Sequence, residues 1–334
     1  KKMTNNKMKK KTTTYLLFGC LTLSVCSSCI YDDLSHCGNL HTLSYSIIDN
    51  TTTARDVIRE ELTAPGTEPM AQELERVLLP MFSDQAHRLS LGFYLTEGSL
   101  HAKTGLNPGG NHHTLQMQLP PVAHEHIALA HNAEAYPVEL RGIEDADELS
   151  FFYNTLPADT TQTEMTGVFM GHALLPAEAS TDTICLTMQN TAAAIVLTPL
   201  SGTPLGEAAM YVRETAMGCA CSDSLFLFDG SPVLRGLRTD AGGLTAFYSA
   251  AFPSRDESAA AAVPDKGLWE VDIYIRMDKE ITKNTLHIDR PLRAGIPQVL
   301  SFTVDDRGEI APSQDVTVSV ELDWNPGFDF DLEL

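Results

Sequence analysis

The stretch DVTVSVELDW, residues 315–324, alternates apolar and polar side chains without a break. Successive side chains of a β-strand point to opposite faces, so this pattern predicts a strand with one buried and one water-facing side. The apolar residues of the stretch are Val316, Val318, Val320, Leu322 and Trp324. WEVDIYIRM at 269–277 repeats the pattern, with Trp269 at an inward position.

The same alternation recurs through most of the chain. It is present at 89–95, 115–119, 183–188, 224–228 and 301–304. Turn-forming residues lie between these stretches, as in NPGG at 107–110 and DDRG at 305–308. Strands with one apolar face are typical of antiparallel sheets packed face to face. The sequence therefore predicts an all-β fold of antiparallel β-sandwiches.

Two segments have a helical pattern instead. Residues 53–62 begin with Thr53 and Asp56, whose spacing resembles a capping box. Residues 70–79 have an apolar stripe, and Pro80 is expected to end that helix. The stripe consists of Leu74, Val77 and Leu78.

The polar stretch PADTTQTEMTG at 157–167 is the best candidate for a linker between two domains. We expect an N-terminal sandwich at 39–160 and a C-terminal sandwich at 161–334. Residues 29–38 are expected to form a linker that precedes both.

The N-terminus has the pattern of a secretory signal peptide at residues 1–28. A basic stretch precedes an apolar run at 15–25, which small residues follow. The run is shorter than the roughly 20 residues that a spanning helix needs, so it predicts a cleaved signal rather than a membrane anchor.

The small residues before Cys29 resemble a bacterial lipobox, in which the cysteine is acylated and becomes the mature N-terminus. Cys26 stands where such boxes usually have leucine, and cleavage at Cys20 or Cys26, or cleavage without lipidation, remains open. We expect lipidation at Cys29 and attachment to a membrane through several acyl chains.

The net charge of the chain limits which kinds of partner it can bind. The chain has 23 basic and 44 acidic residues, and six of the basic residues precede Cys29. The expected mature chain therefore carries a formal charge of −27. Such a surface repels phosphate backbones, so we expect no nucleic-acid partner.

Histidines are dense between residues 112 and 131. His124 and His126 point to the same face of a strand, where both could bind one metal ion. The spacing matches no established metal motif, and the competing interpretation is a solvated strand face. The other histidines are His112, His113 and His131. We expect no metal and no cofactor.

No catalytic motif stands out, so we expect no enzyme. The chain has neither a G-x-S-x-G nor an S-x-x-K pattern. Cys185 lies in an alternating stretch, where a buried inert thiol is expected. Whether Cys37, Cys185, Cys219 or Cys221 form disulfides is open, although Cys219 and Cys221 are too close to pair with each other without strain.

The segment CIYDDLSHC at 29–37 resembles the start of FimB-type fimbrial anchor proteins, which are lipoproteins of Bacteroidota. Asp32 and Asp33 also resemble the short acidic tag that directs some lipoproteins to the outer leaflet. Weaker similarities follow in order along the chain, as at 119–132, 168–172 and 316–324.

The resemblance implies two tandem transthyretin-like sandwiches and a role in tethering a fimbrial shaft to the outer membrane.

 The resemblance does not identify the shaft subunit. In such fimbriae, subunits polymerise by strand exchange, in which a groove in one sandwich accepts a strand from its neighbour. A first strand at 40–48 that stays in place would close the groove and end the polymer. The tail at 326–334 alternates as well, and it could be a donor strand or the edge strand of its own domain.

A surface glycan-binding lipoprotein of a nutrient-uptake system is the alternative function. Such proteins stack sugars on exposed aromatic side chains. Aromatic residues make up only 7% of this chain, and both Trp269 and Trp324 are expected to face inward. We therefore favour a surface-exposed, lipid-anchored fimbrial subunit at the outer membrane.

Overall fold

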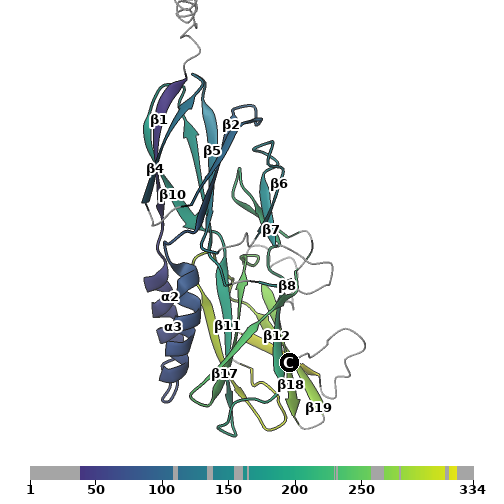
Figure 1. The fold of residues 1–334 in the computed structure, drawn as a ribbon. Helices are drawn as coiled ribbons and strands as arrows, with labels where there is room; N and C mark the ends of the chain where they lie inside the picture. The colour runs from purple at the N-terminus through teal and green to yellow at the C-terminus, as the bar shows by residue number, and fades with distance from the viewer. Residues whose placement is uncertain are drawn as a thin grey trace, which may run out of the picture.

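The computed structural model describes residues 38–107, 112–133, 138–153, 161–163, 165–228, 230, 232–256, 267–277, 280–312 and 316–321. Most of these residues lie in β-strands, and two helices follow the first strand (Figure 1). None of the helices among them has the length and hydropathy needed to cross a bilayer. Residues 1–37, with the expected signal peptide and Cys29, lie outside the described part.

The first sandwich consists of seven strands in the order β3-β2-β5-β9-β10-β1-β4. Their bounds are β1 (Asn39–Ile47), β2 (Arg88–Leu95), β3 (Leu100–Leu106), β4 (His112–Leu119), β5 (His124–His131), β9 (Val168–Leu175) and β10 (Thr181–Met188). β9 and β10 pair over two residues only, Met170 with Thr187 and Phe169 with Met188. The sheet folds at this junction, so that the layer with β1 faces the layer with β2 and β5.

The second sandwich packs a four-stranded sheet, β16-β17-β11-β20, against a six-stranded sheet, β21-β19-β18-β12-β15-β8. The first of these sheets contains β11 (Thr191–Pro199), β16 (Leu237–Ala241), β17 (Leu244–Ala251) and β20 (Gln298–Val304). The second contains β8 (Thr161–Gln162), β12 (Ala208–Arg213), β15 (Leu234–Arg235), β18 (Trp269–Met277), β19 (Glu280–Ile288) and β21 (Val316–Glu321).

A smaller sheet, β14-β13-β7-β6, lies beside both sandwiches (Figure 1). It contains β6 (Val138–Arg141), β7 (Ser150–Tyr153), β13 (Gly218–Ala220) and β14 (Leu225–Leu227). Phe151 of β7 belongs to the same buried cluster as Ile127 of β5 and Ile195 of β11. The small sheet therefore joins the two sandwiches through one continuous apolar core.

The helices α2 (Thr51–Glu61) and α3 (Glu68–Phe82) pack on the outer face of the four-stranded sheet. β11 is therefore covered on both sides: Ala194 and Val196 face the helices, and Ile195 faces the six-stranded sheet. A strand buried on both faces has a continuous apolar sequence rather than an alternating one. This explains why the run TAAAIVL at 191–197 lacks the pattern of the other strands.

The helix ends differ from the sequence-based expectation. Thr53 lies inside α2, and Asp49 binds the first turn of the helix instead. The Asp49 carboxylate accepts hydrogen bonds from the amide and the hydroxyl of Thr51 at 2.9 and 3.0 Å. The capping box predicted at Thr53 and Asp56 is therefore wrong. α3 continues past Pro80 to Phe82. Pro80 has no amide hydrogen to donate to the carbonyl of Arg76, and the helix ends two residues later.

The β-sandwich architecture is confirmed, but the pairing is not purely antiparallel. β1 pairs with β10, β11 with β20 and β15 with β8 in parallel. Parallel pairs arise where the chain crosses over another element between two strands. α2 and α3 are among the elements that lie between β1 and β10 in the sequence.

The strand pairing also departs from the expected division at 160/161. β9 and β10 follow that point but pair with β5 and β1 of the first sandwich. α2 and α3 precede it but cover the second sandwich. The chain thus passes from one sandwich to the other more than once.

We predict that Gly171→Ala destabilises the fold. A Cβ atom at Gly171 would lie 2.7 Å from Ile184 Cγ2 and 2.9 Å from the backbone oxygen of Cys185. Overpacking of this kind lowers the free energy of unfolding by about 1–3 kcal/mol, which urea titration measures. Gly206→Ala is the matched control, since no atom lies within 4 Å of its added Cβ. Equal stability of the two variants would contradict the packing described for β9 and β10.

Candidate functional site

β1 lies inside its sheet and is hydrogen-bonded along both edges (Figure 1). Asn39–Ser46 pair with β4 in antiparallel register, and Thr42–Ile47 pair with β10 in parallel register. The strand predicted at 40–48 is therefore confirmed, and it fills the place between two neighbours. An incoming strand would have to displace β1 to occupy the place between β4 and β10.

Every second side chain of β1 points into the first sandwich. His41, Leu43, Tyr45 and Ile47 are buried there, whereas Leu40 is 47% exposed. Burial of a leucine or isoleucine side chain contributes roughly 1.5–3 kcal/mol to the free energy of unfolding. The strand is thus held by its side chains as well as by its main chain.

Tyr45 connects β1 to the opposite layer through His126. The His126 Nδ1 atom lies 2.8 Å from the carbonyl oxygen of Gly92, which can only accept a hydrogen bond. The neutral ring therefore donates from Nδ1 and accepts at Nε2 from the Tyr45 hydroxyl, 3.0 Å away. Phe93 stacks on the same ring with a centroid distance of 4.3 Å.

Burial sets the protonation of this pair. It lowers the pKa of His126 to about 4, although the hydrogen bond to Gly92 partly opposes that shift. It also raises the pKa of the Tyr45 hydroxyl. Both groups are therefore neutral at neutral pH, as the hydrogen bond between them requires.

The interpretation of the histidines as a solvated strand face is wrong. His124, His126 and His131 are buried. His124 has its ring 5.2 Å from that of His101, and burial lowers its pKa. Ala128 and Ala130 lie on the same inner face of β5 as His124 and His126. Their small side chains leave room for the two imidazole rings. Within the described residues, no three histidine, cysteine or acidic side chains are placed to hold a metal ion.

The cysteines divide into buried and exposed thiols. Cys219 and Cys221 are fully buried and unpaired with each other, and burial raises the pKa of Cys219 to about 12. Such thiols are poor nucleophiles. Cys185 is exposed, so its expected burial is wrong: Ile184 and Leu186 occupy the inward positions of β10. Cys29 and Cys37 lie outside the described residues.

We predict that acid destabilises the first sandwich through His126. Its pKa in the folded state is below the ordinary value of 6.5, so the stability is complete above pH 6.5 and is lost as the pH falls toward about 4. Between about pH 7.5 and about pH 5 the loss due to this one ring is about 2 kcal/mol.

Urea unfolding of His126→Gln at the two pH values measures this contribution. The variant is expected to be less sensitive to acid than the parent chain by that amount. His87→Gln replaces an exposed histidine and serves as the control. An unchanged pH dependence in His126→Gln would show that the buried ring does not carry the effect.

No family model matches the chain. No curated protein matches its sequence either. Among solved structures, the chain is similar to a proposed adhesin from Bacteroides thetaiotaomicron, with a TM-score of 0.52 and 11% identity over 86% of this chain and 98% of that one. A proposed adhesin from Bacteroides ovatus gives a TM-score of 0.50 and 10% identity over 90% and 98%.

The fimbrial anchor protein Mfa2 from Porphyromonas gingivalis has a TM-score of 0.41 and 7% identity, covering 85% of this chain and 98% of that one. This match is too weak to carry an argument. The two Bacteroides structures establish the fold. The chain therefore shares the β-sandwich architecture of these proposed adhesins.

Proposed function

We propose that the chain is a lipid-anchored fimbrial subunit that tethers a shaft to the outer membrane and ends strand-exchange polymerisation. The observation that carries the proposal is the position of β1 between β4 and β10. A sandwich whose own strand fills this place offers a donor strand no groove between β4 and β10. The role is structural and needs neither catalysis nor a cofactor.

The place where the described chain begins supports the tether. β1 starts at the end of the first sandwich that lies farthest from the second (Figure 1). Cys29 precedes Gly38 by nine residues, which span at most about 30 Å. A lipid on Cys29 would hold this end near the bilayer and direct the second sandwich away from it.

The glycan-binding alternative has less support. Trp269 is fully buried, and its Nε1 donates a hydrogen bond to the carbonyl oxygen of Arg290 at 2.8 Å. It therefore offers no surface on which a sugar could stack. Trp324 lies outside the described residues.

Replacing Cys29 tests the tether. Cys29→Ala is expected to move the protein from the membrane pellet to the soluble fraction, because no acyl chain can then be attached. Cys26→Ala is the matched control and should leave the protein in the pellet. Full retention of Cys29→Ala in the membrane would contradict lipidation at this position.

Loosening β1 tests the closed groove. We predict that the parent chain takes up no labelled peptide with the sequence of residues 39–47, whereas Leu43→Ala/Tyr45→Ala does, because its own strand is held less firmly. Gel filtration with fluorescence detection measures the uptake. Leu40→Ala changes an exposed residue of the same strand and should resemble the parent. Uptake of the peptide by the parent chain would contradict a groove closed by β1.

A further inference from the structure

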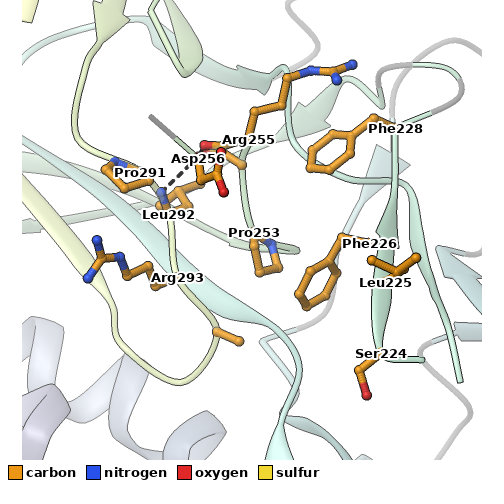
Figure 2. Close-up of a pocket in the computed structure, with 12 residues that line it drawn as sticks. Ser224, Leu225, Phe226, Phe228, Pro253, Arg255, Asp256, Pro291, Leu292 and Arg293 are labelled. Carbon is orange, nitrogen blue, oxygen red and sulfur yellow. Dashed lines mark hydrogen bonds between the residues drawn. The ribbon is translucent and has the colours of Figure 1, made fainter. Parts of the chain in front are cut away.

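A cleft of about 640 Å³ lies between the small sheet and loops of the second sandwich. Three segments form it: residues 224–228 around β14, residues 253–256 after β17, and residues 291–294 between β19 and β20. Figure 2 shows side chains from all three around a common space. Its volume is within the range of known ligand sites.

The floor of the cleft is held firmly. The amide of Ser254 donates to the carbonyl oxygen of Leu292, and the amide of Leu292 donates to the Ser254 hydroxyl at 3.0 Å. The carbonyl oxygen of Pro253 accepts from the amide of Ala216 at 2.9 Å. Leu292 and Ser254 are themselves buried. The site is therefore formed before any ligand arrives, which reduces the entropy lost on binding.

The walls are mainly apolar. Phe226 of β14 and Phe228, which follows that strand, extend toward the cleft, with Pro253 near them (Figure 2). Both phenylalanines are only partly buried against the core. Partly exposed aromatic rings beside a firm floor offer pockets for apolar side chains of a partner.

Two arginines give the cleft a charge opposite to that of the whole chain. The Arg255 guanidinium lies over the Phe228 ring, 4.6 Å from its centroid, and Arg293 lies on the other side of the space. Of the described residues that line it, Asp256 is the one with an acidic side chain. The cleft is thus locally basic in a chain with a formal charge of −21. Guanidinium groups bind carboxylates in paired hydrogen bonds.

We propose that this cleft binds an extended peptide segment of a partner protein in which apolar side chains adjoin carboxylates. The apolar side chains would contact Phe226, Phe228 and Pro253, and the carboxylates would pair with Arg255 and Arg293. The site would give the subunit a contact with a partner that strand exchange does not provide. It does not depend on the lipid or on the closed groove.

The polar groups of the cleft favour a peptide over a glycan. The Ser254 hydroxyl already accepts from the Leu292 amide and donates to the carbonyl oxygen of Arg255. Among the described lining residues, Ser224 supplies the other hydroxyl, and no side-chain amide is present. A neutral sugar offers only hydroxyl groups, for which these residues supply few partners besides the two guanidinium groups, whereas the carboxylates of an acidic peptide match those groups directly.

Titration of a labelled nonapeptide tests the proposal on the full chain. PGFDFDLEL, the sequence of residues 326–334, supplies the required alternation, and PGFNFNLQL removes its charges. We expect the acidic peptide to bind at least about tenfold more tightly. Arg255→Gln/Arg293→Gln and Phe226→Ala should each weaken it by a similar factor. Arg307→Gln, which changes an exposed arginine in another turn, should leave it unchanged.

A chain that ends at Asn325 is titrated in parallel, so that its own alternating tail cannot compete with the probe. Raising the salt from about 50 to about 500 mM should weaken binding, because ion pairs at a partly open site are screened. Equal affinity for the acidic and amide peptides, or binding that the cleft variants do not alter, would overturn the proposal. Binding of an oligogalacturonate in the absence of peptide binding would assign the cleft to a glycan instead.

Discussion

The first strand is hydrogen-bonded on both sides, and most features of the first sandwich follow from that constraint. A strand inside a sheet must have backbone partners along both edges and a buried face. β1 has both, through β4, β10 and the inward row from His41 to Ile47. The hydrogen bond between Tyr45 and His126 then joins the two layers and keeps a neutral histidine in the interior.

The same arrangement determines how a load on the N-terminus would travel. A pull at Gly38 acts along β1, parallel to the hydrogen-bonded edges of β4 and β10. If the opposing force acts at the far end of β10, the hydrogen bonds between β1 and β10 are loaded together rather than one after another. β10 leads directly into β11, the strand buried on both faces of its sheet. A proposed membrane tether is thus continuous with the most buried layer of the second sandwich.

Alternation predicted the individual strands well because it depends only on neighbouring residues. The strands at 269–277 and 183–188 are present as expected, and the buried side of β10 is that of Ile184. Their partners were not predictable in this way. β9 and β10 return to the first sandwich through long-range pairing, which no local pattern encodes.

The surroundings of the cysteine and histidine side chains and of the cleft were likewise only partly predictable from neighbouring residues. A thiol at the outward phase of β10 could have been recognised from its neighbours, but the burial of His124 and His126 depends on which layer faces β5. The cleft combines β14 with Arg255 and Arg293, which are far apart in the sequence. Its only local signal was the pair Phe226 and Phe228, two residues apart on one face of a strand.

Hydrogen exchange of the native chain tests most directly whether β1 is a fixed part of the first sandwich. Mass spectrometry can compare the backbone amides of residues 39–47 with those of β3, an edge strand with one neighbour. The account predicts that amides in β1 exchange far more slowly than those in β3. Exchange in β1 as fast as in β3 would mean that the strand leaves its place readily, and the groove could not then be considered closed.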